Sequence, residues 1–116
     1  MAVAAARLAV EETGISTDPA IQGGLAAAGD GSWGDTPARA AVQGVTDEHD
    51  EQYFDRFDSD TGEQMPPFRR ARAAAALWFA LADDPAHAAA EALYEASYAL
   101  NADDDARLIE LFPQAD

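Results

Sequence analysis

His49 is the residue best suited by type to chemistry, because four carboxylates surround it in the run Asp47-Glu48-His49-Asp50-Glu51. Neighbouring negative charges favour a protonated imidazole, so we expect a raised pKa for His49. An imidazole in such a setting can serve as an acid, a base or a metal ligand. One candidate function is therefore a small metal- or ligand-binding protein that uses His49 and its neighbouring carboxylates.

The spacing around His49 argues against a metal site on a single helix. Residues three or four positions apart share a helix face, and from His49 those steps reach Val45, Thr46, Gln52 and Tyr53. None of these is a good metal ligand. We therefore predict that His49 is a packing or capping residue and that the protein holds no metal.

Two further polar clusters have structural interpretations. The segment Asp58–Glu63 resembles the start of a calcium loop, but Gly62 falls at position 5 and Arg69 at position 12, where Glu belongs. We expect it to be a solvated linker. Arg69, Arg70 and Arg72 could form an anion site, but we expect them to pair with carboxylates of neighbouring helices, with the stem of Arg72 on the core.

The sequence contains no catalytic constellation that we can identify. It has no Cys, which excludes thiolate chemistry and disulfides. No Gly-rich phosphate loop, nucleophile elbow or Ser/His/Asp triad is present. Carboxylates are so numerous that choosing any two as acid and base would be arbitrary. We predict no catalytic residues, no cofactor and no enzymatic activity.

Charge restricts the class of partner. The 116 residues include 22 Asp plus Glu against 7 cations, all Arg, for a formal net charge of −15. Clustered cations supply most of the affinity for nucleic acids and anionic membranes, so neither is an expected partner. The longest apolar run, 73–82, is shorter than the ~20 residues of a membrane span. The apolar start of the chain lacks the basic region of a signal peptide, and we expect a soluble cytoplasmic protein.

Helix-forming residues dominate, and no segment alternates apolar and polar residues as a half-buried strand does. We predict an all-α fold, a compact single domain over residues 1–116 with five or six helices. The 29 Ala residues indicate an alanine-rich core with closely spaced helices. The expected helices cover about residues 2–12, 19–28, 37–57, 68–81, 85–100 and 103–112, with Thr17 or Asp18 capping the second and Asp35 or Thr36 capping the third.

Several positions in these helices have specific expectations. The fourth helix is apolar on most sides, so it should be central and should bury Trp78. The pair Pro66-Pro67 should keep Met65 and Pro66 out of the helix. Gly23 and Gly24 should weaken the second helix. Trp33, in a Gly-rich loop, should fold back onto the core.

The third helix separates apolar from acidic residues. Val42, Val45, His49 and Tyr53 fall on one stripe, which should face the core. The opposite face holds five carboxylates, which we predict to be a partner-binding surface for a basic protein: Asp47, Asp50, Glu51, Asp55 and Asp58.

The stretch from Phe68 to Leu100, FRRARAAAALWFALADDPAHAAAEALYEASYAL, resembles the alanine-rich, all-helical immunity proteins of bacterial polymorphic-toxin systems. This resemblance implies a non-catalytic cytoplasmic protein that binds and blocks a partner, such as a basic toxin or a regulator. It assigns no functional residue. The remaining alternative is an orphan helical domain whose acidity is an adaptation to a high-salt or high-GC host, such as a halophile or an actinobacterium.

Overall fold

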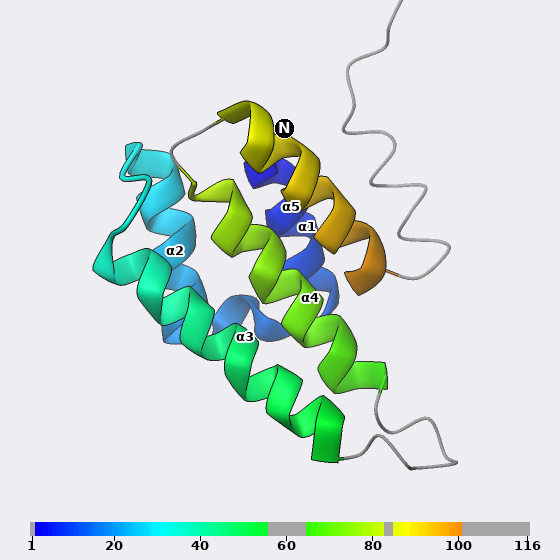
Figure 1. Cartoon of the computed structure of the whole chain (residues 1–116). Coiled ribbons are helices and arrows are strands. Elements are labelled where there is room, and N and C mark those ends of the chain that lie inside the picture. The colour runs from blue at the N-terminus through cyan, green and yellow to red at the C-terminus, as the bar shows by residue number, and fades with distance from the viewer. Residues whose placement is uncertain (1, 56–64, 83–84, 101–116) are drawn as a thin grey trace, which may run out of the picture.

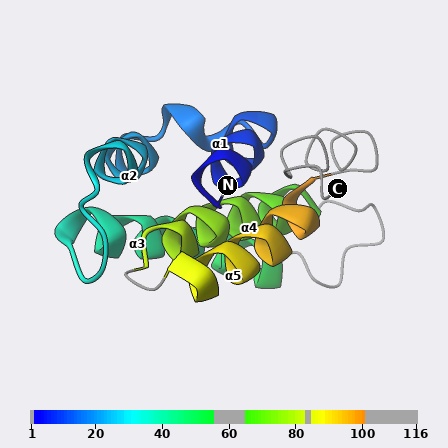
Figure 2. The ribbon, with the colours of Figure 1, turned by 90° about the horizontal axis from the view of Figure 1, so that it is seen from above.

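A computed structural model shows a two-layer bundle of α-helices and describes residues 2–55, 65–82 and 85–100. One layer contains α3 (Pro37–Asp55), α4 (Met65–Ala80) and α5 (Pro85–Ala99), with α4 in the middle (Figure 1). The other layer contains α1 (Ala2–Glu12) and α2 (Pro19–Asp30), which lie across it (Figure 2). The predicted all-α single-domain bundle is confirmed over this part of the chain.

Local sequence signals determine the corner between α1 and α2. Gly14 adopts the left-handed conformation, with φ of 83°, after the last turn of α1. A short 3-10 turn, Ile15–Thr17, follows. Asp18 then caps α2 by accepting a hydrogen bond from Ala20 N at 2.8 Å. Pro19 begins the helix at a position that needs no N–H donor, so the chain turns there as the sequence predicts.

The loop from α2 to α3 is attached to the end of α4. Gly31, with φ of 73°, ends α2, and Thr36 caps α3 by accepting from Arg39 N at 3.1 Å. Between them, Gly34 N–H donates to the Leu81 carbonyl at 2.6 Å. This bond fixes the start of α3 beside the C-terminal end of α4.

The fourth helix begins earlier than the sequence indicates. We expected Met65 and Pro66 to be outside it, but α4 starts at Met65. Pro66 and Pro67 occupy its first turn, where a helix has no use for their missing N–H groups. Pro67 is also fully buried, so packing supports this start.

Helix α4 is central, as predicted, and contacts each of the other four α-helices. Leu77 of α4 and Leu81, directly after this helix, are fully buried with Val10, Ile21 and Val42. Most of the remaining core is alanine, on α1, α4 and α5. A Cβ added at Gly24 would meet Val42 Cγ2 at 2.6 Å and Leu77 Cδ2 at 2.9 Å, so α2 approaches α3 and α4 at a point where only glycine fits.

Two tryptophan predictions are wrong. Trp33 is 46% exposed, because its loop is held to α4 through the backbone of Gly34 and not through the indole. Trp78 is only half-buried at the edge of the core. Arg39 of α3 covers its ring.

Some expectations concern residues outside the described ranges. They include the end of the third helix beyond Asp55, the linker Asp58–Glu63 and the sixth helix over about 103–112. Among the helices that the structure does describe, none combines the length and the apolar character that a membrane crossing requires.

Candidate functional site

Three of the five predicted partner-binding carboxylates form an exposed acidic row on α3. Asp47, Glu51 and Asp55 are exposed, and within the described ranges none of them forms an ion pair. Asp47 accepts a hydrogen bond from Gln43 Nε2, on the same helix, at 2.8 Å. We call these three residues the α3 carboxylates. Their charges are uncompensated by the cations that the structure describes.

Asp50 does not belong to this outer row. Its two carboxylate oxygens accept hydrogen bonds from Arg72 Nη2 at 3.0 and 3.1 Å. Arg72 Nη1 donates to Glu95 of α5 at 3.0 Å, so one guanidinium joins α3, α4 and α5. The predicted outward position of Asp50 is wrong because Arg72 of α4 holds its carboxylate toward that helix, where the Asp50 side chain is only 33% exposed. Asp58, the fifth predicted residue, lies outside the described ranges.

His49 is half-buried against α4, and its environment is opposite to the one expected. Arg70 Nε donates to His49 Nδ1 at 3.3 Å, and Arg70 Nη2 donates to Gln52 at 3.4 Å. Burial first, and then the charge of Arg70, lower the pKa of His49 below its ordinary 6.5. The predicted rise is wrong because these two effects outweigh the attraction of Glu48. Over the described ranges, no three His, Asp or Glu side chains are grouped closely enough to hold a metal ion.

The expected pairing with carboxylates of neighbouring helices is confirmed for Arg72, whose partners are Asp50 and Glu95. Arg70 bonds instead to two uncharged partners, His49 and Gln52. Both guanidiniums bond to polar groups of neighbouring helices, and the Arg72 side chain is only 23% exposed. The Nε of Arg72 is buried without a hydrogen-bond partner. These two arginines therefore connect α4 to α3, and Arg72 also connects α4 to α5.

A feature that the sequence analysis missed is a row of aromatic rings across three helices. Neighbouring ring centres are 5.0 to 6.3 Å apart along the series, which runs through Phe54, Tyr53, Phe68, Tyr98 and Tyr94. We call these residues the aromatic ridge. Phe54, Tyr94 and Tyr98 are 69%, 56% and 48% exposed. The adjacent pair Tyr53-Phe54 and the four-residue spacing of Tyr94 and Tyr98 were the available signals.

The ridge adjoins both the Arg72 junction and the α3 carboxylates. A shallow pocket of about 200 Å³ opens beside it, lined by Phe68, Tyr94, Tyr98 and the Arg72–Glu95 pair. Phe54 follows Glu51 by three residues, so it projects from the same side of α3 as the α3 carboxylates. Exposed aromatic area and uncompensated negative charge therefore occur together on this surface.

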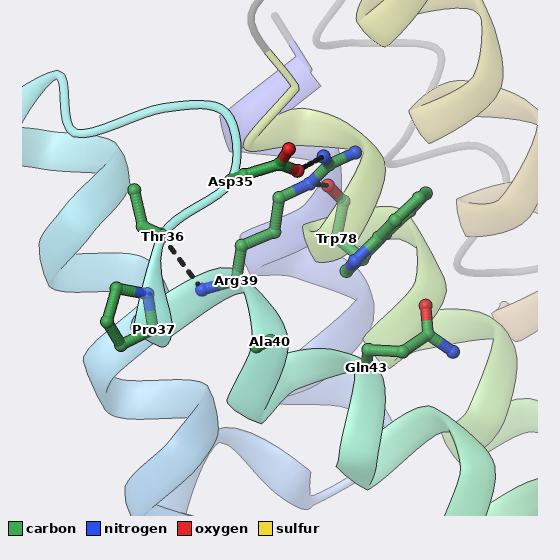
Figure 3. Close-up of a pocket in the computed structure, with 7 residues that line it drawn as sticks. All are labelled: Asp35, Thr36, Pro37, Arg39, Ala40, Gln43 and Trp78. Carbon is green, nitrogen blue, oxygen red and sulfur yellow. Dashed lines mark hydrogen bonds and ion pairs between the residues drawn. The ribbon is translucent and has the colours of Figure 1, made fainter.

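A second pocket, of about 570 Å³, lies between the start of α3 and the end of α4 (Figure 3). The Arg39 guanidinium carbon is 3.7 Å from the centre of the Trp78 ring. Arg39 Nε donates to the Trp78 carbonyl at 3.0 Å. Pro37, Ala40 and Gln43 form other parts of the wall. This pocket was not predicted, because it requires the packing of two helices whose residues are distant in sequence.

Comparisons with known proteins give no match: no protein-family model, no curated protein and no solved structure is significantly similar to this chain.

Proposed function

We propose that this protein is a non-catalytic binding protein that recognises a basic protein partner through the aromatic ridge and the α3 carboxylates. The observation that supports this most strongly is the exposure of Phe54, Tyr94 and Tyr98 beside carboxylates that have no ion-pair partner in the described ranges. A large contiguous apolar patch on a soluble protein is a recognised sign of an interaction site.

The two parts of this surface would contribute differently. Aromatic side chains supply large apolar contact area and are enriched among the residues that dominate binding energy. Their ring faces also attract Lys and Arg. The α3 carboxylates would act at longer range by steering a basic partner toward the ridge and raising the association rate. The formal charge of −15 acts in the same direction.

The resemblance to immunity proteins suggests a basic toxin as the partner, and a basic regulator would have the same chemistry. A cytoplasmic location is part of the proposal, since a chain without Cys does not need an oxidising compartment for its stability. The shared requirement is a partner surface that combines Lys or Arg with apolar side chains.

Matched variants test the proposal. Glu51→Gln/Asp55→Asn neutralises two charges beside Phe54, and Glu11→Gln/Asp30→Asn neutralises two exposed charges of α1 and α2 with the same chemistry. Each immobilised protein is used to capture partners from a lysate of the source organism. A specific partner should bind the parent and the α1/α2 control equally. It should associate more slowly with the α3 variant, with less salt dependence.

A ridge variant completes the test. Phe54→Ala/Tyr98→Ala truncates two exposed rings and should increase the dissociation rate of the same partner, because such anchors act mainly on the lifetime of a complex. Circular dichroism checks that helix content is retained. If the α3 and ridge variants bind the captured partner with the parent's rates, this surface is not the binding site and its charge serves only hydration.

A further inference from the structure

Arg39 is held firmly at one wall of the 570 Å³ pocket. Its side chain is 13% exposed, and its guanidinium is stacked on Trp78. The hydrogen bond from Nε to the Trp78 carbonyl fixes the orientation of the guanidinium plane. Its charged end is therefore already positioned before anything binds, which reduces the entropy cost of binding.

The two terminal nitrogens of Arg39 lack hydrogen-bond acceptors in the described ranges. The nearest carboxylate oxygen, Asp35 Oδ1, is 3.7 Å from Nη1, and the Asp35 side chain is fully exposed. This distance exceeds that of a hydrogen bond. Arg72 shows the contrast, because both of its terminal nitrogens bond to carboxylates at 3.0 Å. Arg39 thus offers its terminal donors to a group that enters the pocket.

The rest of the pocket favours an apolar body next to that charge. Pro37, Ala40 and Trp78 are its apolar lining residues, and Asp35, Thr36 and Gln43 are the polar ones beside Arg39. In Figure 3 Arg39 and Gln43 lie on different sides of the Trp78 ring, and Pro37 and Ala40 lie on the first turn of α3. Its volume is within the range of about 300–1,000 Å³ typical of small-molecule sites.

We propose that this pocket binds a small monocarboxylic acid with a flat apolar body, whose carboxylate pairs with Nη1 and Nη2 of Arg39. Guanidinium and carboxylate match in a planar, two-bond arrangement, and the apolar body would lie against Pro37, Ala40 and Trp78. The net charge of −15 repels anions in proportion to their own charge, so a monoanion is disfavoured least and polyanions most.

The test uses benzoate as the probe and ¹⁵N NMR of the Trp78 indole N–H as the readout. A Trp33→Phe background leaves Trp78 as the only indole signal. Benzoate should shift this signal saturably. Benzamide, which has the same shape and no charge, should bind at least about tenfold more weakly, because hydrogen bonds between charged groups are the stronger ones. Equal binding of benzamide would overturn the assignment of a carboxylate site.

Three further variants separate the pocket from the general effect of charge. Arg39→Gln and Arg7→Gln each remove one cation, but Arg7 is exposed on α1, so only Arg39→Gln should lose benzoate binding. Asp35→Asn removes the competing carboxylate and should tighten binding about two- to fivefold, the value of an exposed ion pair.

Two further results would also overturn the proposal. One is benzoate binding to Arg39→Gln with the parent's affinity, provided that circular dichroism shows the fold. The other is an unshifted Trp78 signal with benzoate in both the parent and Asp35→Asn, a test that does not require Arg39→Gln to fold.

Discussion

Arg72 is the side chain at which α3, α4 and α5 meet. It forms ion pairs with Asp50 and Glu95, whose side chains are 33% and 12% exposed. A guanidinium shared between two largely buried carboxylates adds little net stability, because each charge loses hydration on burial. Removing the cation alone, however, leaves two carboxylates facing each other.

Arg72→Met should therefore lower the free energy of unfolding by roughly 3 kcal/mol, the lower end of the range for a broken buried pair, because Asp50 stays partly hydrated. Urea unfolding measures this loss. Adding Glu95→Gln should recover part of it, since the second change removes an unpaired charge. Arg7→Met, on the surface of α1, is the control and should change stability by less than about 0.5 kcal/mol. Equal losses for the two arginines would contradict a structural role for Arg72.

His49 makes stability depend on pH in a direction set by its surroundings. Burial and Arg70 lower its pKa in the folded protein, so the unfolded chain binds a proton more readily. Stability should fall as the pH drops through 6.5, the ordinary His pKa, toward the lower folded value. His49→Asn should flatten this dependence. Urea unfolding of both proteins at pH 7.5 and 5.5 tests it, and a steeper or unchanged slope in the variant would show that His49 is not responsible.

At the scale of elements, the contact of α2 with α3 and α4 depends on a glycine. The Cβ of an alanine at Gly24 would meet two fully buried side chains, Val42 and Leu77, and the branched Val42 has little freedom to move away. Gly23, on the exposed side of the same helix, has no neighbour within 4 Å of an added Cβ. Gly24 is thus needed for close packing of α2, whereas Gly23 has room for a side chain.

Gly23→Ala should stabilise the protein by about 0.5–1 kcal/mol, because alanine loses less backbone entropy in a helix. Gly24→Ala should instead destabilise it by about 1–3 kcal/mol through overpacking. Thermal unfolding of the two variants compares a single methyl group at consecutive positions. If both substitutions stabilise, α2 can move away from α4 at no cost.

The elements were predictable where the signal is local. Asp18 before Pro19 and Thr36 before Pro37 are caps of the predicted kind, and the apolar content of α4 correctly predicted its central position. Helix periodicity did not determine how far α3 is rotated about its axis. Arg72 bonds to Asp50 and holds it toward α4, and Arg70 donates a hydrogen bond to His49. Neither contact is visible from α3 alone.

The candidate sites were predicted less well, for a related reason. The α3 carboxylates share one helix face, so their spacing is sufficient to group them. The aromatic ridge instead joins Phe54, Phe68 and Tyr98 from three helices, and the second pocket joins Arg39 to Trp78. Such groupings depend on helix order and packing, which no single segment encodes.

For the whole molecule, we expect the net charge to determine how stability depends on salt. A net charge of −15 on 116 residues creates repulsion that disfavours the compact state. Screening shortens the reach of this repulsion, to a Debye length of about 3 Å at 1 M salt. The melting temperature measured by circular dichroism should therefore rise between about 50 mM and about 2 M KCl.

The triple variant Asp47→Asn/Glu51→Gln/Asp55→Asn, with a net charge of −15 + 3 = −12, is the matched comparison. It should melt at a higher temperature than the parent in low salt and gain less from KCl, because less repulsion remains to be screened. A melting temperature of the parent that does not change with salt would remove repulsion as a factor in its stability.

The hydrogen bond from the Gly34 amide to the Leu81 carbonyl has a consequence for the slow motions of the protein. This amide is buried within a loop whose neighbours Trp33 and Asp35 are exposed. Its proton can exchange with solvent deuterium only when the loop leaves α4, so its exchange lifetime reports the frequency of that opening. Arg39 and Trp78 link α4 to α3, the helix that follows this loop. An occupant of their pocket would therefore lengthen the exchange lifetime of the Gly34 amide. The exchange lifetime of this one backbone amide therefore reports both the opening of the loop and the binding of a ligand in the pocket.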